Sequence, residues 1–284
     1  MSQKHDVIIA GISEASVIVA AELARAGLKV IVLKKTGERG MMKYSAKAWD
    51  SDDNIMSDWP ISDKELKAGY NRVEKELARA AADGKLEEFL RFVAVETGNL
   101  ELRPFAQVKL VHRDSLGRAK GVSYFNAQGE PEDLESEIVI LAGDALENAR
   151  LLLVSGINKN GDVGRRFYPY SAQSDCQASC KLDPVTKDAY GLPVLQIHYK
   201  WQDNHGREYQ STLVDQFVHG CGTHRMGWDR KETVVDPYGE VHECKGLFAI
   251  GAGQLPSFVP CHPMKTIMAL AYMTADRLLY RVHR

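Results

Sequence analysis

The chain begins with an alternation of apolar and polar segments that is typical of a strand–helix–strand unit. Residues 6–11 form a continuous apolar run that ends in glycine, as expected for a buried parallel strand. Residues 14–26 carry apolar positions at helical spacing and stop at Gly27. A second apolar run, residues 29–33, follows at once. Because parallel strands need a crossover, these segments predict one β-α-β unit.

The rest of the chain is predicted to add strands and helices to this unit. We expect helices at 63–82, 86–95, 145–154 and 264–279, and strands at 100–112, 121–126, 134–141, 192–200 and 247–250. The polar stretch 36–62 is predicted to be loop. Residues 165–209 are alternating and polar, which favours a second, antiparallel layer inserted before the chain returns to the first domain.

Length and composition exclude several classes of protein. A sequence of 284 residues is long enough for one large core or two modest ones. A formal net charge of −2 gives no reason to expect nucleic acid or an anionic membrane as partner. The sequence contains no apolar run of membrane-spanning length and no signal-peptide core, so no membrane span is expected. The five cysteines include no C-x-x-C pair, so we expect free thiols, a cytoplasmic setting and no metal site.

Two histidines near the end of the chain are candidates for proton transfer. His219 and His262 each lie in a turn-rich segment, and the apolar run 247–250 with Gly251 and Gly253 lies between them. An imidazole has a pKa of about 6.5 and exchanges protons near neutral pH. Two loop histidines beside a glycine-rich strand end therefore predict an acid/base pair.

The first strand–helix turn departs from the pattern of a dinucleotide site. Such a site has G-x-G-x-x-G, in which the second glycine lets the backbone approach the pyrophosphate and the third lets the helix pack on the strand. Gly11 keeps the first position, whereas Ser13 and Ser16 occupy the other two. Each hydroxyl either donates to phosphate or caps the helix. Glu14 opposes a bound pyrophosphate, and Lys34 stands where an acid normally accepts from the ribose. A dinucleotide site and its folded remnant both remain open.

Several short motifs occur along the chain in an order that is typical of one enzyme family. They are D-V-I-I-A-G at 6–11, S-D-W-P-I-S at 57–62, I-V-I-L-A-G at 138–143, N-A-R-L-L-L at 148–153, V-G-R-R-F at 163–167, G-T-H-R-M-G at 222–227 and H-P-M-K-T at 262–266. This order resembles the glucose–methanol–choline (GMC) flavoprotein oxidoreductases, and most of all their pyranose 2-oxidase branch. The resemblance implies an α/β fold with a Rossmann-like FAD-binding domain, residues 1–164 and 215–284, and a reduced antiparallel-sheet substrate domain, residues 165–214.

The resemblance also implies an activity. Members of the family oxidise CH–OH groups of sugars or alcohols by passing hydride to FAD, with a histidine as base. His219 matches that base and His262 the second position of the pair. The positions that match cofactor contacts are Gly11, Ser13, Ser16, Lys34, Gln107, Gly143, Gly251, Ala252, Pro263 and Met264. Residues 38–44 replace the family's flavin segment and contain no histidine, so the FAD is expected to be non-covalent.

The expected partners are a small sugar or alcohol and an electron acceptor, either a small molecule or a protein. The changes at Ser13, Ser16 and Lys34 keep a second hypothesis open. It is a flavin-free member of the fold that acts as a binding module, or as a non-redox enzyme in which the histidine pair moves a proton.

Overall fold

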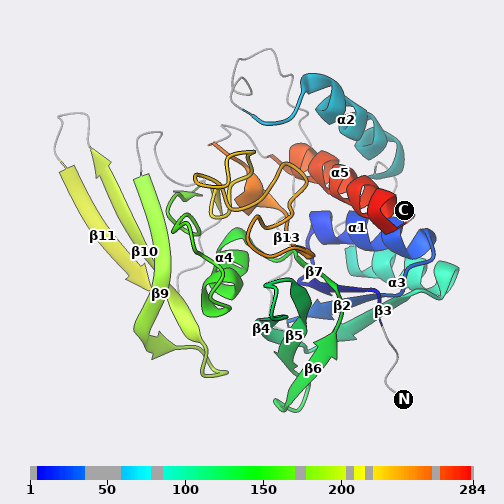
Figure 1. The fold of residues 1–284 in the computed structure, drawn as a ribbon, viewed down its shortest axis with the longest axis horizontal. Helices are drawn as coiled ribbons and strands as arrows, with labels where there is room; N and C mark the ends of the chain where they lie inside the picture. Colours follow the sequence, from blue (N-terminus) through cyan, green and yellow to red (C-terminus); the bar gives the residue numbers. More distant parts are fainter. Residues whose placement is uncertain are drawn as a thin grey trace.

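The structure is a computed structural model that describes residues 5–35, 59–77, 86–169, 177–202, 208–214, 220–257 and 263–282 (Figure 1). His219 and His262 lie outside the described residues, as do the segment 38–44 and most of the predicted loop 36–62.

A five-stranded parallel sheet forms the centre of the molecule, in the order β13–β7–β1–β2–β3. The strands are β1 (Val7–Ala10), β2 (Val30–Lys34), β3 (Leu100–Pro104), β7 (Ile138–Leu141) and β13 (Leu247–Ala249). Every residue of β1 and of β13 is buried. Continuous apolar strands are expected where both faces of a parallel sheet are covered. The predicted β-α-β unit is confirmed, with β1 paired to β2.

Helices cover one face of this sheet (Figure 1). α1 (Glu14–Arg25) packs against α3 (Leu86–Thr97) and α5 (Met264–Val282), and α2 (Asp63–Leu77) packs on α5. Arg72 of α2 donates hydrogen bonds to Glu22 of α1 and Asp276 of α5, which ties three helices into one layer. Among the described helices, none is long and apolar enough to cross a bilayer.

The opposite face carries a small antiparallel sheet (Figure 1). It consists of β4 (Gln107–Arg113), β5 (Ala119–Phe125) and β6 (Pro131–Glu135), and β5 contacts β7 of the parallel sheet. α4 (Ala145–Val154) follows β7, and the short 3-10 helix η3 (Ala252–Gln254) follows β13. The core therefore lies between the helical layer and this second sheet.

A separate antiparallel sheet projects from one end of the molecule (Figure 1). Its strands are β9 (Gln177–Lys187), β10 (Pro193–Gln202) and β11 (Glu208–Val214). Two short strands, β8 (Tyr168–Pro169) and β12 (Gly220–Cys221), form a pair of their own. Tyr190, in the turn between β9 and β10, stacks on Phe125 of β5 with ring centroids 5.4 Å apart. The antiparallel layer predicted for this part of the chain is confirmed.

Two predicted strands were wrong in extent. The run 100–112 is divided at Phe105, which has a φ of 58°, so that β3 joins the parallel sheet and β4 the antiparallel one. The run 134–141 is likewise divided between β6 and β7, which lie in different sheets. Apolar periodicity does not distinguish these cases, because burial in either sheet gives the same pattern.

Candidate active site

Three strands of the parallel sheet are followed by a glycine at their carboxyl ends. Gly11 follows β1, Gly143 follows β7, and Gly251 comes shortly after β13. β1 lies between β7 and β2. The chain first adds β2 and β3 on one side of β1, and later adds β7 and β13 on the other side. Open parallel sheets bind ligands in the crevice outside the carboxyl ends of their strands at such a switch point. The topology therefore locates the candidate site at this glycine crossing, which we define as Gly11, Gly143 and Gly251.

Gly11 and Gly251 differ in the space that the glycine crossing leaves beside each of them. Gly11 has a φ of 102°, and a Cβ built on it would lie 2.7 Å from Cα of Gly143, so no side chain fits there. Gly251 has a φ of 106°, which favours glycine for backbone reasons. Among the described atoms, a Cβ on Gly251 would meet only the carbonyl oxygen of Gly143, at 3.8 Å. Gly251 is itself buried, and its N–H donates to Gln254 Oε1 at 3.3 Å, so what this glycine leaves is space beside its Cα.

Asn148 fixes the geometry of this crossing, and the sequence analysis did not assign it a role. Its Oδ1 accepts the N–H of Gly143 at 3.0 Å, and its Nδ2 donates to the carbonyls of Ile250 at 3.0 Å and Leu141 at 3.3 Å. The side chain is buried, with an exposed fraction of 1%. One amide thus joins the ends of β7 and β13. The signal in the sequence was a polar residue among apolar ones, in the first turns of a predicted helix that follows a strand and a glycine.

The turn between β1 and α1 is capped by its own serines. Ser13 is the N-cap of α1, and Ser13 and Ser16 form a capping box. Ser13 Oγ also donates to the carbonyl of Ala142 at 2.7 Å, which links the turn to the end of β7. Burial raises the pKa of the neighbouring Glu14 carboxyl. The described structure therefore has both hydroxyls in the capping role that the sequence left as one of two alternatives.

The end of β2 carries lysines in place of the acid of a ribose site. Lys34 Nζ lies 2.5 Å from Oε2 of Glu87 in α3, and both side chains are partly exposed. Hydrogen bonds from Lys34 and Arg91 hold the pKa of Glu87 below its ordinary value. Lys34 is thus directed toward α3 by an ion pair.

Gln107 belongs to a second polar group, next to the amino end of α4. Its Nε2 donates to Glu147 at 3.2 Å, and Arg150 donates to both oxygens of the same carboxylate. Burial alone would raise the pKa of Glu147, but Arg150, Lys35 and Gln107 together lower it. Within the described residues, the buried Oε1 of Gln107 has no hydrogen-bond partner.

The motif at 222–227 packs directly against the segment that follows β13. The N–H of His224 donates to the carbonyl of Gly253 at 3.0 Å, and Thr223 Oγ1 donates to the carbonyl of Ala145 at 2.7 Å. Pro263 and Met264 stand at the start of α5, where the carbonyl of Pro263 accepts the N–H of Ile267. Both described neighbours of the histidine pair, Gly220 and Pro263, thus belong to segments that are held in the fold.

His224 is a neutral packing residue. Its side chain is fully buried, Nδ1 lies 3.0 Å from Thr223 Oγ1, and burial lowers its pKa to about 3. A Cβ on Gly253 would lie 2.0 Å from its ring, so the imidazole fills the space that this glycine leaves. His224 therefore does not exchange protons in the pH range where an imidazole base acts.

This burial predicts a loss of stability in acid. The unfolded chain protonates His224 below about pH 6.5, whereas the folded chain keeps it neutral down to about pH 3. The contribution of His224 to the free energy of unfolding should therefore be complete above the unfolded pKa of about 6.5. It should decrease by about 1.4 kcal/mol per pH unit as the pH falls from there toward the folded pKa. Urea unfolding at about pH 7.5 and about pH 5.5 should show the wild type losing about 1.4 kcal/mol more than His224→Gln. An equal loss in the two proteins would contradict the assignment.

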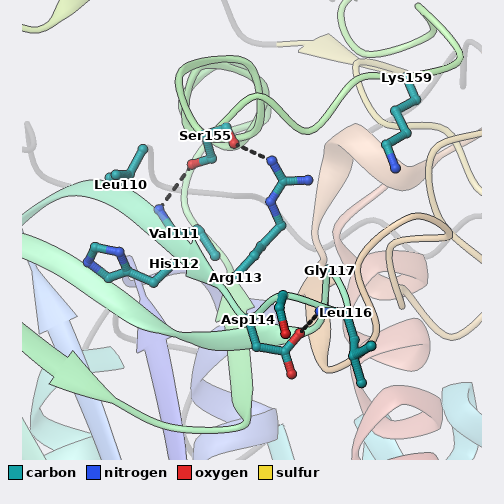
Figure 2. Close-up of a pocket in the computed structure, with 10 residues that line it drawn as sticks. Leu110, Val111, His112, Arg113, Asp114, Leu116, Gly117, Ser155 and Lys159 are labelled. Atoms are coloured by element: carbon teal, nitrogen blue, oxygen red, sulfur yellow. Dashed lines mark hydrogen bonds between the residues drawn. The ribbon is translucent and has the colours of Figure 1, made fainter.

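A cavity of about 600 Å³ lies elsewhere, at the other end of α4 (Figure 2). Arg113 and Lys159 border it, with Asp114 and Leu116 of the β4–β5 turn. Arg113 donates to the carbonyl of Ser155 at 3.2 Å and so caps the carboxyl end of α4. Because α4 has 10 residues, its two ends are roughly 15 Å apart. This cavity is therefore distinct from the glycine crossing, which lies at the amino end.

Sequence comparison identifies the family. Residues 106–271 match the family model described as GMC oxidoreductase, and this match covers more than half of the 284 residues. The chain belongs to the GMC oxidoreductase family. The matched region contains β4 to β13 and the first part of α5. For this GMC oxidoreductase chain, the resemblance inferred from the sequence is confirmed.

Individual relatives act on sugars and related compounds, according to their names. A C-glycoside 3-oxidase of Arthrobacter globiformis is 34% identical over 120 residues, which are 34% of this chain and 23% of the relative. The gluconate 2-dehydrogenase flavoprotein of Pantoea cypripedii is 28% identical over 126 residues, 34% of this chain and 20% of the relative. The pyranose 2-oxidase of Tricholoma matsutake is 28% identical over 115 residues, 32% of this chain and 20% of the relative. The chain thus matches between 20% and 23% of the length of these curated relatives.

The fold has a solved counterpart. The crystal structure of pyridoxine 4-oxidase from Mesorbium loti superposes with a TM-score of 0.58 at 13% sequence identity, over 99% of this chain and 100% of that chain. At this identity the likeness concerns the fold alone. The predicted fold class is confirmed in its coarser part, as a mixed α/β GMC oxidoreductase fold with parallel and antiparallel sheets.

Proposed function

We propose that the chain is an FAD-dependent oxidoreductase that converts a CH–OH group of a small sugar or alcohol to a carbonyl. The observation that carries this proposal is the glycine crossing at the switch point of the parallel sheet, in a chain of the GMC oxidoreductase family. The sugar and alcohol oxidoreductases among its relatives support the substrate class.

The described residues are compatible with FAD at the crossing, with one displacement. Among the described atoms, none lies closer than 3.8 Å to the position of a Cβ on Gly251, which suits close approach of a flat ring, and Asn148 joins Gly143 to Ile250, the residue before Gly251. The N–H groups of Ser13 and Ser16 are paired with each other's hydroxyls, so a pyrophosphate bound by the N–H of Ser16 must displace the Ser13 hydroxyl. Gly11, Gly143, Gly251 and Ala252 are the residues that would hold the cofactor.

The chain's own residues supply the proton chemistry. An alcohol loses a hydroxyl proton and a hydride when it becomes a carbonyl, and FAD, when bound, supplies the hydride acceptor. We assign the proton to an imidazole nitrogen of His219, and to His262 a hydrogen bond to the substrate oxygen. A base with a pKa near the working pH is the most effective for this step. The buried His224 is excluded from this role because its pKa is about 3.

We also propose two functional domains. Residues 1–164 and 215–284 contain the parallel sheet, its helices and the β4–β6 sheet, and they form the FAD-binding domain. Residues 165–214 contain the projecting sheet β9–β11, which forms the reduced substrate domain. The Tyr190–Phe125 stack and the Arg150–Asp188 pair, at 3.8 Å, connect the two.

The cofactor is tested by a visible spectrum. The purified protein, supplied with excess FAD and then desalted, is expected to retain flavin absorption. Anaerobic addition of an oxidisable sugar or alcohol should bleach that absorption, because hydride transfer reduces the flavin. A protein that retains no flavin under these conditions would contradict the proposal, and a flavin that no polyol, sugar or alcohol bleaches would contradict the substrate class.

A second candidate function is favoured by the satisfied turn of α1. A flavin-free member of the family would need no anion at this helix, and the reciprocal bonds of Ser13 and Ser16 satisfy two N–H groups of the turn without one. Such a chain would act as a binding module, or as a non-redox enzyme in which the histidine pair transfers a proton on a keto sugar. The absence of bound flavin together with isomerisation of a keto sugar would favour the enzyme form of this alternative.

A further inference from the structure

The two serines of the first turn form a closed hydrogen-bond circuit. The N–H of Ser13 donates to Ser16 Oγ at 2.8 Å, and the N–H of Ser16 donates to Ser13 Oγ at 3.3 Å. Ser16 Oγ then donates to the carbonyl of Ser13 at 2.8 Å, and Ser13 Oγ to the carbonyl of Ala142 at 2.7 Å. A hydroxyl has one hydrogen to donate. Each serine hydroxyl therefore donates its hydrogen to a backbone carbonyl and accepts a hydrogen bond from one backbone N–H.

A glycine turn would have none of these bonds. With glycine at positions 13 and 16, the backbone N–H groups of both residues would lose their side-chain acceptors. Unpaired N–H groups at a helix start are the donors that bind a phosphate in a dinucleotide fold. Ser16 is fully buried, so its amide has no water as an alternative partner. In this chain, two side-chain hydroxyls accept the N–H groups that a glycine turn would leave without these acceptors.

We propose that Ser13 and Ser16 act as an internal occupant of the pyrophosphate position, so that FAD binds only by displacing the Ser13 hydroxyl. This inference rests on the proposed function and adds a determinant of cofactor affinity to it. The serines position the turn and set its affinity for an anion, and they take no part in hydride or proton transfer. Displacement must break the bond from Ser13 to Ala142, which joins the turn to the end of β7.

Two consequences distinguish this proposal from the alternative that the two serines change the turn without affecting the affinity for FAD. The ligand-free protein should be stabilised by the serines, because they accept two N–H groups at the start of α1. Affinity for a ligand with a pyrophosphate should be reduced by them, whereas affinity for riboflavin, which has the ring but no phosphate, should not change. A Glu14 side chain held in the same first turn reinforces the discrimination against an anion.

The experiment compares the wild type with Ser13→Gly and with Ser13→Gly/Ser16→Gly. Affinities for FAD and for riboflavin are measured by quenching of flavin fluorescence, and the melting temperature is measured without ligand. Glycine is well tolerated as an N-cap, so the single variant should fold even where the double variant does not. Ser62→Gly is the matched control, since Ser62 forms the same kind of reciprocal cap with Glu65 at the start of α2.

We expect the glycine variants to bind FAD about 10-fold or more tightly than the wild type, because an anion no longer competes with a hydroxyl. Riboflavin affinity should be unchanged, the ligand-free melting temperature should be lower, and Ser62→Gly should lower the melting temperature without changing FAD affinity. FAD binding that is equal or weaker in the glycine variants would overturn this inference alone. Failure of every variant to bind FAD or riboflavin would overturn the proposed function as well.

Discussion

Gly11→Ala is expected to destabilise the fold by about 2–5 kcal/mol, a large part of the 5–15 kcal/mol that typically stabilises a domain. The φ of 102° is unfavourable for an L-residue, and the new methyl would lie 2.7 Å from both Cα and N of Gly143. These atoms belong to the backbone of β7 and its turn, which Asn148 holds in place, so they do not yield as a side chain would. Urea unfolding gives the change in free energy, with an unchanged dependence on urea expected.

Gly143→Ala is the matched control for this prediction. Gly143 contacts Gly11, but its φ is not in the positive range, and a Cβ on it would lie 3.5 Å from the nearest neighbouring atom, Oδ1 of Asn148. That is an ordinary contact, so the free energy of unfolding should change by less than about 1 kcal/mol. Similar losses of unfolding free energy in the two variants would show that the close approach of Gly11 to Gly143 is not the reason why Gly11→Ala is destabilising.

His219→Ala is expected to lower kcat by about 10²- to 10⁴-fold while FAD binding is retained. The reason is the loss of the group to which we assign the hydroxyl proton. In the wild type, kcat/KM should decrease as the pH falls below about 6.5, and this limb should disappear in the variant. The measurement is a steady-state pH profile, with the sugar or alcohol that bleaches the flavin as substrate.

His112→Gln provides a control for the histidine experiment. His112 borders the cavity at the far end of α4 and bonds to Ser123 and Asp133, away from the glycine crossing. Its replacement should leave both kcat and the pH profile unchanged. If His219→Ala kept wild-type turnover, the proton would have to be assigned elsewhere, and His262→Ala would be the next variant to examine.

The β-α-β unit at the start of the parallel sheet could be predicted from the sequence because β1 and β2 are continuous apolar runs on either side of a helix that ends at glycine. The runs around Val7 and Val30 are buried on both faces, and such runs have few alternative locations in a fold. The division at Phe105 could not be predicted, since neither side of it changes the apolar pattern. The same limitation hid the role of Asn148, whose three partners come from the ends of two strands that are distant in sequence.

The sequence by itself determined the family, the β-α-β unit and the identity of the residues at the first turn, because these depend on local pattern and on residue type. It left open whether Ser13 and Ser16 serve a phosphate or the helix. Only the tertiary structure decided which protein atoms these hydroxyls meet, because Ser13 Oγ reaches the carbonyl of Ala142, a neighbour created by the pairing of β1 with β7. A hydroxyl bonds to whichever partners the fold brings within about 3 Å, and the pairing of strands far apart in the chain sets those partners.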